Sequence, residues 1–279
     1  MALRAARLER KPALAVAVTV LFFAWLYLPI LAVALFSFND KKSLSAFSGF
    51  SLRWYDDLFH NSGLIRSLVA SIEIATVSTV GSLVLGTMLA LGLERVRSRR
   101  GRVIGAVTLL PLVTPEIVTG VAALLLFTGV GLKLSMTTVI LAEVTFSIAY
   151  VTVIVRGRLA GVSTEVEEAA RDLGCTPFQA LRLVTLPTLV PALVGAGLLV
   201  FALVFDDFVL AFFTTGVDPQ PLPVRIYSSI RFGVSPAINA VGTLMLAFSA
   251  LLIVAALLLP RLFHRRSSSL DLITGGERR

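Results

Sequence analysis

Cysteine and histidine are almost absent from this sequence, which has one cysteine, Cys175, and two histidines, His60 and His264. A single cysteine excludes a scaffold held together by disulfides, and three such residues scattered along a chain do not make the ligand set of a zinc site. We interpret all three as structural or surface residues. The sequence predicts no metal centre.

Charged residues are also scarce, at 15% of the chain, compared with about a quarter in soluble domains. Apolar residues reach 56% before glycine is counted, whereas soluble chains contain about 45–50% with glycine included. The mean hydropathy is +0.89. This composition predicts an integral membrane protein and excludes a disordered chain. The net charge of +8 is typical of membrane loops and does not point to nucleic acid.

Apolar stretches long enough to cross a bilayer occur six times. The first, at 12–39, contains no charged residue or histidine. It is too long for the apolar core of a signal peptide, so we expect an uncleaved helix, with cleavage near Ala34 as the alternative. The other five spans are predicted at 67–93, 103–130, 135–155, 188–214 and 236–260. We therefore predict an all-α membrane protein with a six-helix domain at 13–260, preceded by an N-terminal segment at 1–12 and followed by a tail at 261–279.

The loops that alternate between the spans differ in their content of Lys and Arg. The N-terminus, the loop at 94–102, the segment at 156–187 and the tail together hold 18 of these residues, and the loops of the other side hold 7. Basic residues are enriched in cytoplasmic loops. The sequence therefore predicts that both termini and the 156–187 segment are cytoplasmic.

The segment at 156–187 contains signals for two short helices. Thr164 and Glu167 have the spacing of a capping box, and Gly174 can end the first helix. Thr176 and Pro177 can begin the second, and Pro187 is expected to interrupt it before the fifth span. The pattern predicts a helix–turn–helix hairpin, for which a simple connecting loop is the alternative.

The hairpin resembles a known motif. Glu168, Ala169 and Ala170 are followed after three residues by Gly174, and nine residues later by Val184, Thr185, Leu186 and Pro187. This resembles the EAA loop of binding-protein-dependent ABC importer permeases, with Val184 in place of isoleucine. The resemblance implies a type I importer permease fold and a loop that docks on a cytoplasmic ATPase.

The same resemblance implies that this subunit works in a complex. The expected partners are a second homologous permease, two ABC ATPase subunits and an extracytoplasmic substrate-binding protein, all at the bacterial inner membrane. The chain has no phosphate-binding loop of the GxxxxGK[ST] type, so ATP and Mg²⁺ would be bound by the ATPase and this chain would carry no cofactor. In the loop, Glu168 and Asp172 would face basic or N–H groups of that partner, while Ala169 and Ala170 would permit close packing.

Five carboxylates lie within the predicted spans, and no Lys, Arg or His accompanies them: Glu73, Glu116, Glu143, Asp206 and Asp207. A charged carboxylate near the bilayer centre costs about 2.5–3.5 kcal/mol, so each needs a proton, a partner or a cationic solute. We expect Glu73 to be peripheral. Asp206 and Asp207 would point about 100° apart on one helix, so that only one lines a path.

Further stretches resemble the second permease subunit of spermidine/putrescine importers, among them Trp54-Tyr55, Leu110 to Glu116, Phe205 to Phe208 and Leu222-Pro223. This resemblance implies a cationic amine as the solute. Carboxylates with aromatic side chains offer such a solute both charge pairing and cation–π contacts. The predicted pathway residues are Asp206, Asp207, Glu116, Glu143, Tyr150 and Phe208, with Phe205 and Phe212 as further aromatics.

The sequence thus predicts a permease subunit, without catalytic residues of its own, of an ATP-driven importer for a small cationic amine. Two alternatives remain at this stage. One is a permease of the same type for another small solute. The other is a self-contained proton-coupled transporter, which would have no need of the 168–187 pattern.

Overall fold

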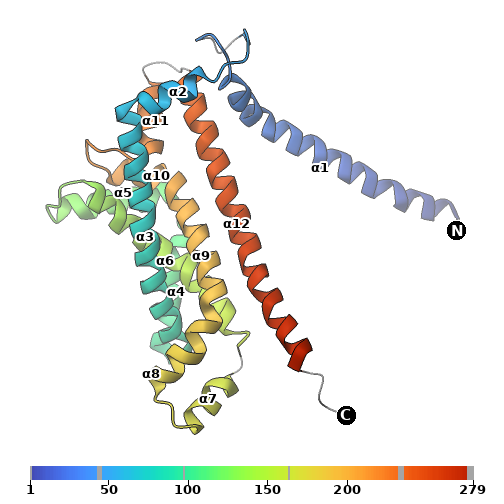
Figure 1. Cartoon of the computed structure of the whole chain (residues 1–279), viewed down its shortest axis with the longest axis vertical. Coiled ribbons are helices and arrows are strands. Elements are labelled where there is room, and N and C mark those ends of the chain that lie inside the picture. The colour runs from blue at the N-terminus through green and yellow to red at the C-terminus, as the bar shows by residue number, and fades with distance from the viewer. Residues whose placement is uncertain (1, 43–45, 97, 163, 232–235, 275–279) are drawn as a thin grey trace. The chain divides into compact units, whose positions relative to one another are not determined.

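The computed structural model describes residues 2–42, 46–96, 98–162, 164–231 and 236–274. These ranges are almost entirely helical, and the β pairing within them is an isolated bridge between Asn39 and Phe50 (Figure 1). The predicted all-α class is confirmed. The chain divides into two units: Met1–Ser62 with Ile226–Leu246, and Gly63–Arg225 with Ala247–Arg279.

Within the described residues, five helical runs are long and apolar enough to cross a membrane. They are α1 (Ala2–Phe36), α3 (Ser62–Arg95), α6 (Met136–Leu159), the run from α8 (Pro177–Ala180) through the π-helical η1 (Leu181–Thr185) to α9 (Leu186–Asp206), and α12 (Pro236–Thr274). A sixth span results if α4 (Arg99–Val113) and α5 (Glu116–Gly129) are taken as one broken span. Five of the six predicted spans thus correspond to apolar helices, and the sixth, at 103–130, does so if the bent pair counts as one span. The last helix continues past the predicted membrane boundary as far as Thr274.

Two of the predicted spans are not continuous helices. The stretch predicted at 103–130 bends by 110° between α4 and α5, where Thr114, the residue before Pro115, has ψ of 134°. A residue preceding proline is pushed out of the α region by the proline ring, which explains this break. The stretch predicted at 188–214 stops at Asp206, and a separate helix, α10 (Val209–Thr214), follows.

The predicted interruption at Pro187 is wrong. The helix runs through this residue because the preceding turn, η1, is π-helical, with the Leu186 N–H donating to the carbonyl of Leu181 five residues earlier. A proline ring in an α-helix collides with the carbonyl four residues before it. The wider π turn relieves this collision. The second half of the hairpin is therefore continuous with the membrane helix α9.

In the larger unit, α6 lies against α4, α9 and α10. Val139, Val151 and Val155 of α6 are fully buried, as are Leu189 and Val200 of α9. The helix α3 also approaches α6 closely. A Cβ atom built on its Gly86 would lie 2.7 Å from the Cβ of Val151, so this contact requires a residue without a side chain.

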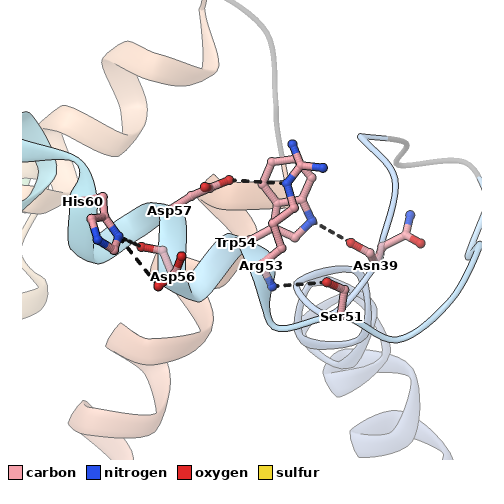
Figure 2. A network of polar contacts seen from close by, with 7 residues as sticks. All are labelled: Asn39, Ser51, Arg53, Trp54, Asp56, Asp57 and His60. Atoms are coloured by element: carbon pink, nitrogen blue, oxygen red, sulfur yellow. Dashed lines mark hydrogen bonds and ion pairs between the residues drawn. The ribbon is translucent and has the colours of Figure 1, made fainter.

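In the smaller unit, the segment after α1 is folded by its own polar contacts and carries α2 (Arg53–His60). The indole N–H of Trp54 donates to the Asn39 carbonyl at 2.6 Å (Figure 2). The Asn39 side chain in turn donates to the Ala46 carbonyl and accepts from the Ser48 N–H. Trp54 is therefore buried as a structural residue, whereas Phe50 and Phe59 on either side of it are exposed.

Candidate functional site

The break after α9 separates the two adjacent aspartates. Asp206 is the last residue of α9, and Asp207 has an extended backbone with ψ of 122°. The Asp207 carboxylate accepts a hydrogen bond from the Leu210 N–H at 3.3 Å, in the first turn of α10. The premise that both side chains project from one continuous helix is therefore wrong. The change of direction allows both aspartates to line the same cavity.

That cavity has a volume of about 590 Å³. It lies where the broken α4–α5 span, α6 and the α9–α10 break come together. All six residues predicted from the sequence line it, namely Glu116, Glu143, Tyr150, Asp206, Asp207 and Phe208. Four of them are acids, and among the described residues no Lys, Arg or His lines the cavity. The four acids of this cavity thus come from three parts of the chain.

Glu143 is the most deeply placed of the four acids, with an exposed fraction of 2%. Its carboxyl group lies within hydrogen-bonding reach of the Asp207 carboxyl, and Glu116 is near enough to both to interact electrostatically. Within the described ranges, Glu143 Oε1 has no hydrogen-bond partner. Glu73 is exposed on α3 and does not line the cavity, as expected for a peripheral acid.

The aromatic lining differs in part from the expectation. Tyr150 and Phe208 line the cavity, but Phe205 and Phe212 do not. Phe205 is instead buried in a cluster with Phe201 and Phe248.

Sequence reasoning missed Phe146 and Ser147, which also line the cavity. The ring centroid of Phe146 lies 5.6 Å from that of Tyr150. A periodic signal was available, because residues 143, 146, 147 and 150 recur at the spacing of one helix face.

Among the residues described, no three His, Cys, Asp or Glu side chains are placed to hold one metal ion.

The hairpin has the predicted form. Its first helix, α7, spans Thr164–Asp172, and Gly174 has φ of +93°. This left-handed conformation is costly for residues with a Cβ atom, so glycine suits the turn. The second helix begins with a capping box in which Thr176 accepts from the Gln179 N–H and Gln179 accepts from the Thr176 N–H.

The predicted capping box of Thr164 and Glu167 falls partly outside the described part of the chain, because the side chain of Thr164 is not described. The Glu167 carboxylate makes two contacts with residues distant in sequence. One of its carboxylate oxygens accepts from Arg95 Nη2 at 3.1 Å, and the other accepts from Thr185 Oγ1 at 3.1 Å. Glu167 therefore fastens α7 to the end of α3 and to the π turn. Arg158 adds a further contact by donating from Nε to the Thr188 carbonyl at 3.3 Å.

The remaining residues of the motif are distributed between the surface and the turn. Glu168, Ala169 and Asp172 are exposed, and Ala170 is half-buried, with its carbonyl accepting from the Cys175 N–H. Leu186 and Pro187 begin α9. Two apolar side chains beside the turn are strongly exposed, Leu173 at 89% and Phe178 at 70%. This surface is apolar enough to be covered by another protein.

The helical spans, the acidic cavity and the exposed hairpin define a class of protein, a multi-pass membrane transport subunit. The chain belongs to the family described as binding-protein-dependent transport system inner membrane component, whose model matches residues 82–269. It is therefore a multi-pass inner-membrane permease subunit, and the resemblance given by the hairpin motif is confirmed.

Similar proteins of known name agree with this assignment. The chain is 37% identical to the spermidine/putrescine transport system permease protein PotC of Haemophilus influenzae, over 86% of this chain and 93% of that protein. It is also 37% identical to the putrescine transport system permease protein PotI of Escherichia coli K12, over 83% of this chain and 85% of that protein. These relatives are named as permeases, so the chain is a non-catalytic transport subunit.

Solved structures share the fold. A chain of a bacterial ABC transporter that imports the acidic polysaccharide alginate matches with a TM-score of 0.72 and 14% identity, covering 89% of this chain and 94% of that one. A chain of the MetNI methionine ABC transporter matches with a TM-score of 0.62 and 21% identity, covering 71% of this chain and 94% of that one. The predicted importer permease fold is confirmed.

Proposed function

We propose that this chain is one half of the membrane pathway of an ATP-driven importer for a small cationic amine, with polyamines such as spermidine and putrescine as the substrate class. Both termini and the hairpin lie in the cytoplasm in this proposal, as the distribution of Lys and Arg predicts. The observation that carries this proposal is the cavity, whose described lining contains four acids and no basic residue.

The acids of this cavity are energetically unfavourable in a membrane unless a proton or a cation neutralises their charge. The cost of each is about 2.5–3.5 kcal/mol when it is charged. A polyamine supplies several ammonium groups on one flexible chain, which can pair with carboxylates from different helices. Anionic solutes would be repelled by the same lining. The names of the similar permeases, which include spermidine and putrescine, support this substrate class.

The aromatic side chains of the cavity supply a second kind of contact. Tyr150, Phe146 and Phe208 line it together with the acids. The face of an aromatic ring attracts a cation, and this attraction is stronger where water is displaced. Methylene groups of an amine chain would also pack on these rings. The site therefore suits a ligand that is cationic and partly apolar.

The hairpin is the proposed coupling element. Glu168, Ala169, Ala170, Asp172 and Gly174 would meet the cytoplasmic ATPase, which would bind ATP and Mg²⁺. Because the second half of the hairpin continues through η1 into α9, displacement of the ATPase would move α9 directly. The end of α9 holds Asp206 of the acidic cavity. Nucleotide-driven motion and the substrate site are thus joined by one helix.

The complex would also contain a second permease and an extracytoplasmic binding protein. The helix α1 contains an apolar stretch, Ala13–Phe36, that is long enough to cross the membrane. A solved neighbour is a bacterial alginate ABC transporter in complex with a periplasmic protein carrying an alginate pentasaccharide.

The test is transport by the assembled complex in proteoliposomes. ATP-dependent uptake of radiolabelled spermidine is measured, with unlabelled putrescine, a neutral amino acid and sulfate as competitors. We expect the amine to compete and the other two solutes to have no effect. Uptake that proceeds without ATP but requires a proton gradient would contradict the proposal and favour the proton-coupled alternative.

A further inference from the structure

A second cavity lies near the hairpin, at the same ends of the membrane helices. Its volume is about 530 Å³, and it is enclosed by the end of α3, the first turns of α4 and the last turns of α6. Its lining is partly apolar, with Leu93, Ala106 and Leu109, and partly charged, with Arg102, Arg156 and Glu94. The acidic cavity and this one share no lining residue.

The two arginines reach the cavity from different helices, Arg102 from the first turns of α4 and Arg156 from the last turn of α6. Within the described part of the chain, neither side chain makes an ion pair or a hydrogen bond. The first turn of α4 contains no acidic residue, so its positive helix end adds to the same field. One carboxylate, Glu94, opposes this charge.

The side chains around the cavity suit a bound lipid molecule. Arg102 and Arg156 stand at the ends of apolar helices, which is the level of the headgroups in a bilayer. Beyond them along α4, Val103, Ile104 and Val107 are exposed and can pack against acyl chains. Guanidinium groups hold phosphate by paired hydrogen bonds, and basic pockets between membrane helices on the cytoplasmic side bind anionic headgroups.

We propose that this cavity binds the phosphodiester of an anionic phospholipid, with Arg102 and Arg156 on the phosphate oxygens and the acyl chains along α4. The site sits beside the contact between Arg95 and Glu167 that fastens the hairpin. A bound lipid would therefore hold the α3–α4 connection in place next to the coupling element. The proposal does not depend on which solute is carried.

The test measures phospholipid bound to the purified, assembled complex by native mass spectrometry, with phosphatidylglycerol and phosphatidylcholine as probes. We expect phosphatidylglycerol to be retained in preference to phosphatidylcholine. The double variant Arg102→Gln/Arg156→Gln should weaken retention by about tenfold or more. The matched control is Arg99→Gln/Arg100→Gln, which removes the same charge from exposed arginines outside the cavity and should change retention by less than about twofold.

Two further variants separate shape from charge. A Cβ at Gly105 would meet Leu93 and Arg156 at ordinary distances of 3.8 and 3.9 Å, so Gly105→Leu fills the cavity without removing a charge and should also abolish retention. Glu94→Gln removes the opposing carboxylate and should raise retention by about twofold to fivefold. Substrate-stimulated ATP hydrolysis, measured in parallel, shows that each variant complex is assembled.

Three outcomes would overturn the proposal. Equal loss in the Arg99→Gln/Arg100→Gln control would mean unspecific attraction by the basic loop. Displacement of the lipid by millimolar inorganic phosphate would assign the site to a soluble anion. A crosslink from Arg102→Cys to the second permease would show that protein, and not lipid, covers the cavity. Normal ATP-dependent uptake alongside any of these would leave the transport function intact.

Discussion

The carboxyl groups of Glu143 and Asp207 interact with each other from two separate segments, Glu143 in the first half of α6 and Asp207 in the break between α9 and α10. Two carboxyl groups at hydrogen-bonding distance repel each other when both are charged, so the pair needs a proton or a cation. An ammonium group of the substrate can fill this role. The pair is the part of the cavity on which the substrate proposal can be tested most directly.

We expect Asp207→Asn to lower ATP-dependent polyamine uptake by about tenfold or more, because one charge-assisted contact with the substrate is lost. The asparagine oxygen can still accept from the Leu210 N–H, so the helix break should persist. The measurement is uptake by proteoliposomes containing the complete complex. The control is Glu73→Gln, which neutralises an acid of α3 outside the cavity and should leave uptake unchanged.

Glu143→Gln tests the deepest acid in the same assay. The substitution keeps the shape of the side chain and its capacity for a hydrogen bond to Asp207, so a loss of transport would report the loss of charge. We expect a decrease of about tenfold, with normal assembly as judged by subunit co-purification. Uptake at the original rate by both single variants and by their combination would contradict a substrate role for the pair.

Ala169→Trp tests the docking surface of the hairpin. Ala169 is exposed, so the indole should be tolerated by the isolated subunit but should obstruct a partner that approaches closely. We expect loss of ATPase co-purification and of substrate-stimulated ATP hydrolysis. Gly129→Trp is the control, since this glycine is also exposed but lies at the end of α5, where nothing would meet a Cβ atom. Unimpaired hydrolysis in Ala169→Trp would refute the assignment of the coupling surface.

Gly174→Ala tests the turn of the hairpin. At φ of +93° a residue with a Cβ atom is strained by roughly 1–2 kcal/mol. We expect the turn to rearrange and the stimulation of ATP hydrolysis by substrate to weaken, while the spans remain folded. Gly129→Ala, at a glycine without positive φ, should behave as the unmodified protein. If the alanine at 174 left stimulation unaltered, the angle set by this turn would not matter for coupling.

Trp54→Phe removes the indole N–H that donates a hydrogen bond to the Asn39 carbonyl. Leaving a buried carbonyl without its partner costs about 1–3 kcal/mol. The segment between α1 and α3 should open more often, and its cleavage by added protease should accelerate by about fivefold or more. Phe59→Leu, on an exposed side chain of the same helix, should leave cleavage unchanged. Equal rates for Trp54→Phe and the unmodified protein would show that this bond does not fix the segment.

Much of the fold could be predicted from local chemistry alone. Long uncharged stretches specify membrane helices because the bilayer leaves few alternatives for the backbone. Thr176, Pro177 and Gly174 specify helix ends through their own side chains and backbone preferences, which do not depend on distant partners. These are the elements for which sequence and structure agree.

The disagreements arise where tertiary structure changes the backbone. A proline at position 187 can either break the helix or be accommodated by a wider turn before it. The sequence does not decide between these two structures, because the choice depends on the surrounding packing. The end of α9 at Asp206 carries no glycine or proline signal. Glu167 accepts hydrogen bonds from Arg95 and Thr185, and no local pattern predicts these contacts because both residues are distant from it in sequence. The acidic residues could be predicted as a set, whereas the pairing of Glu143 with Asp207 depends on that unsignalled break.

The π-helical segment before Pro187 has a consequence for the geometry of force transfer. Such a turn contains one residue more than the α-helical turn it replaces, so the azimuth of the hairpin about the axis of α9 is offset by roughly the 100° that one residue contributes. Deleting a single residue between Leu181 and Thr185 would return the helix to regular winding and swing the coupling surface to another side. The length of this five-residue stretch therefore decides in which direction a pull from the cytoplasm reaches the acidic cavity.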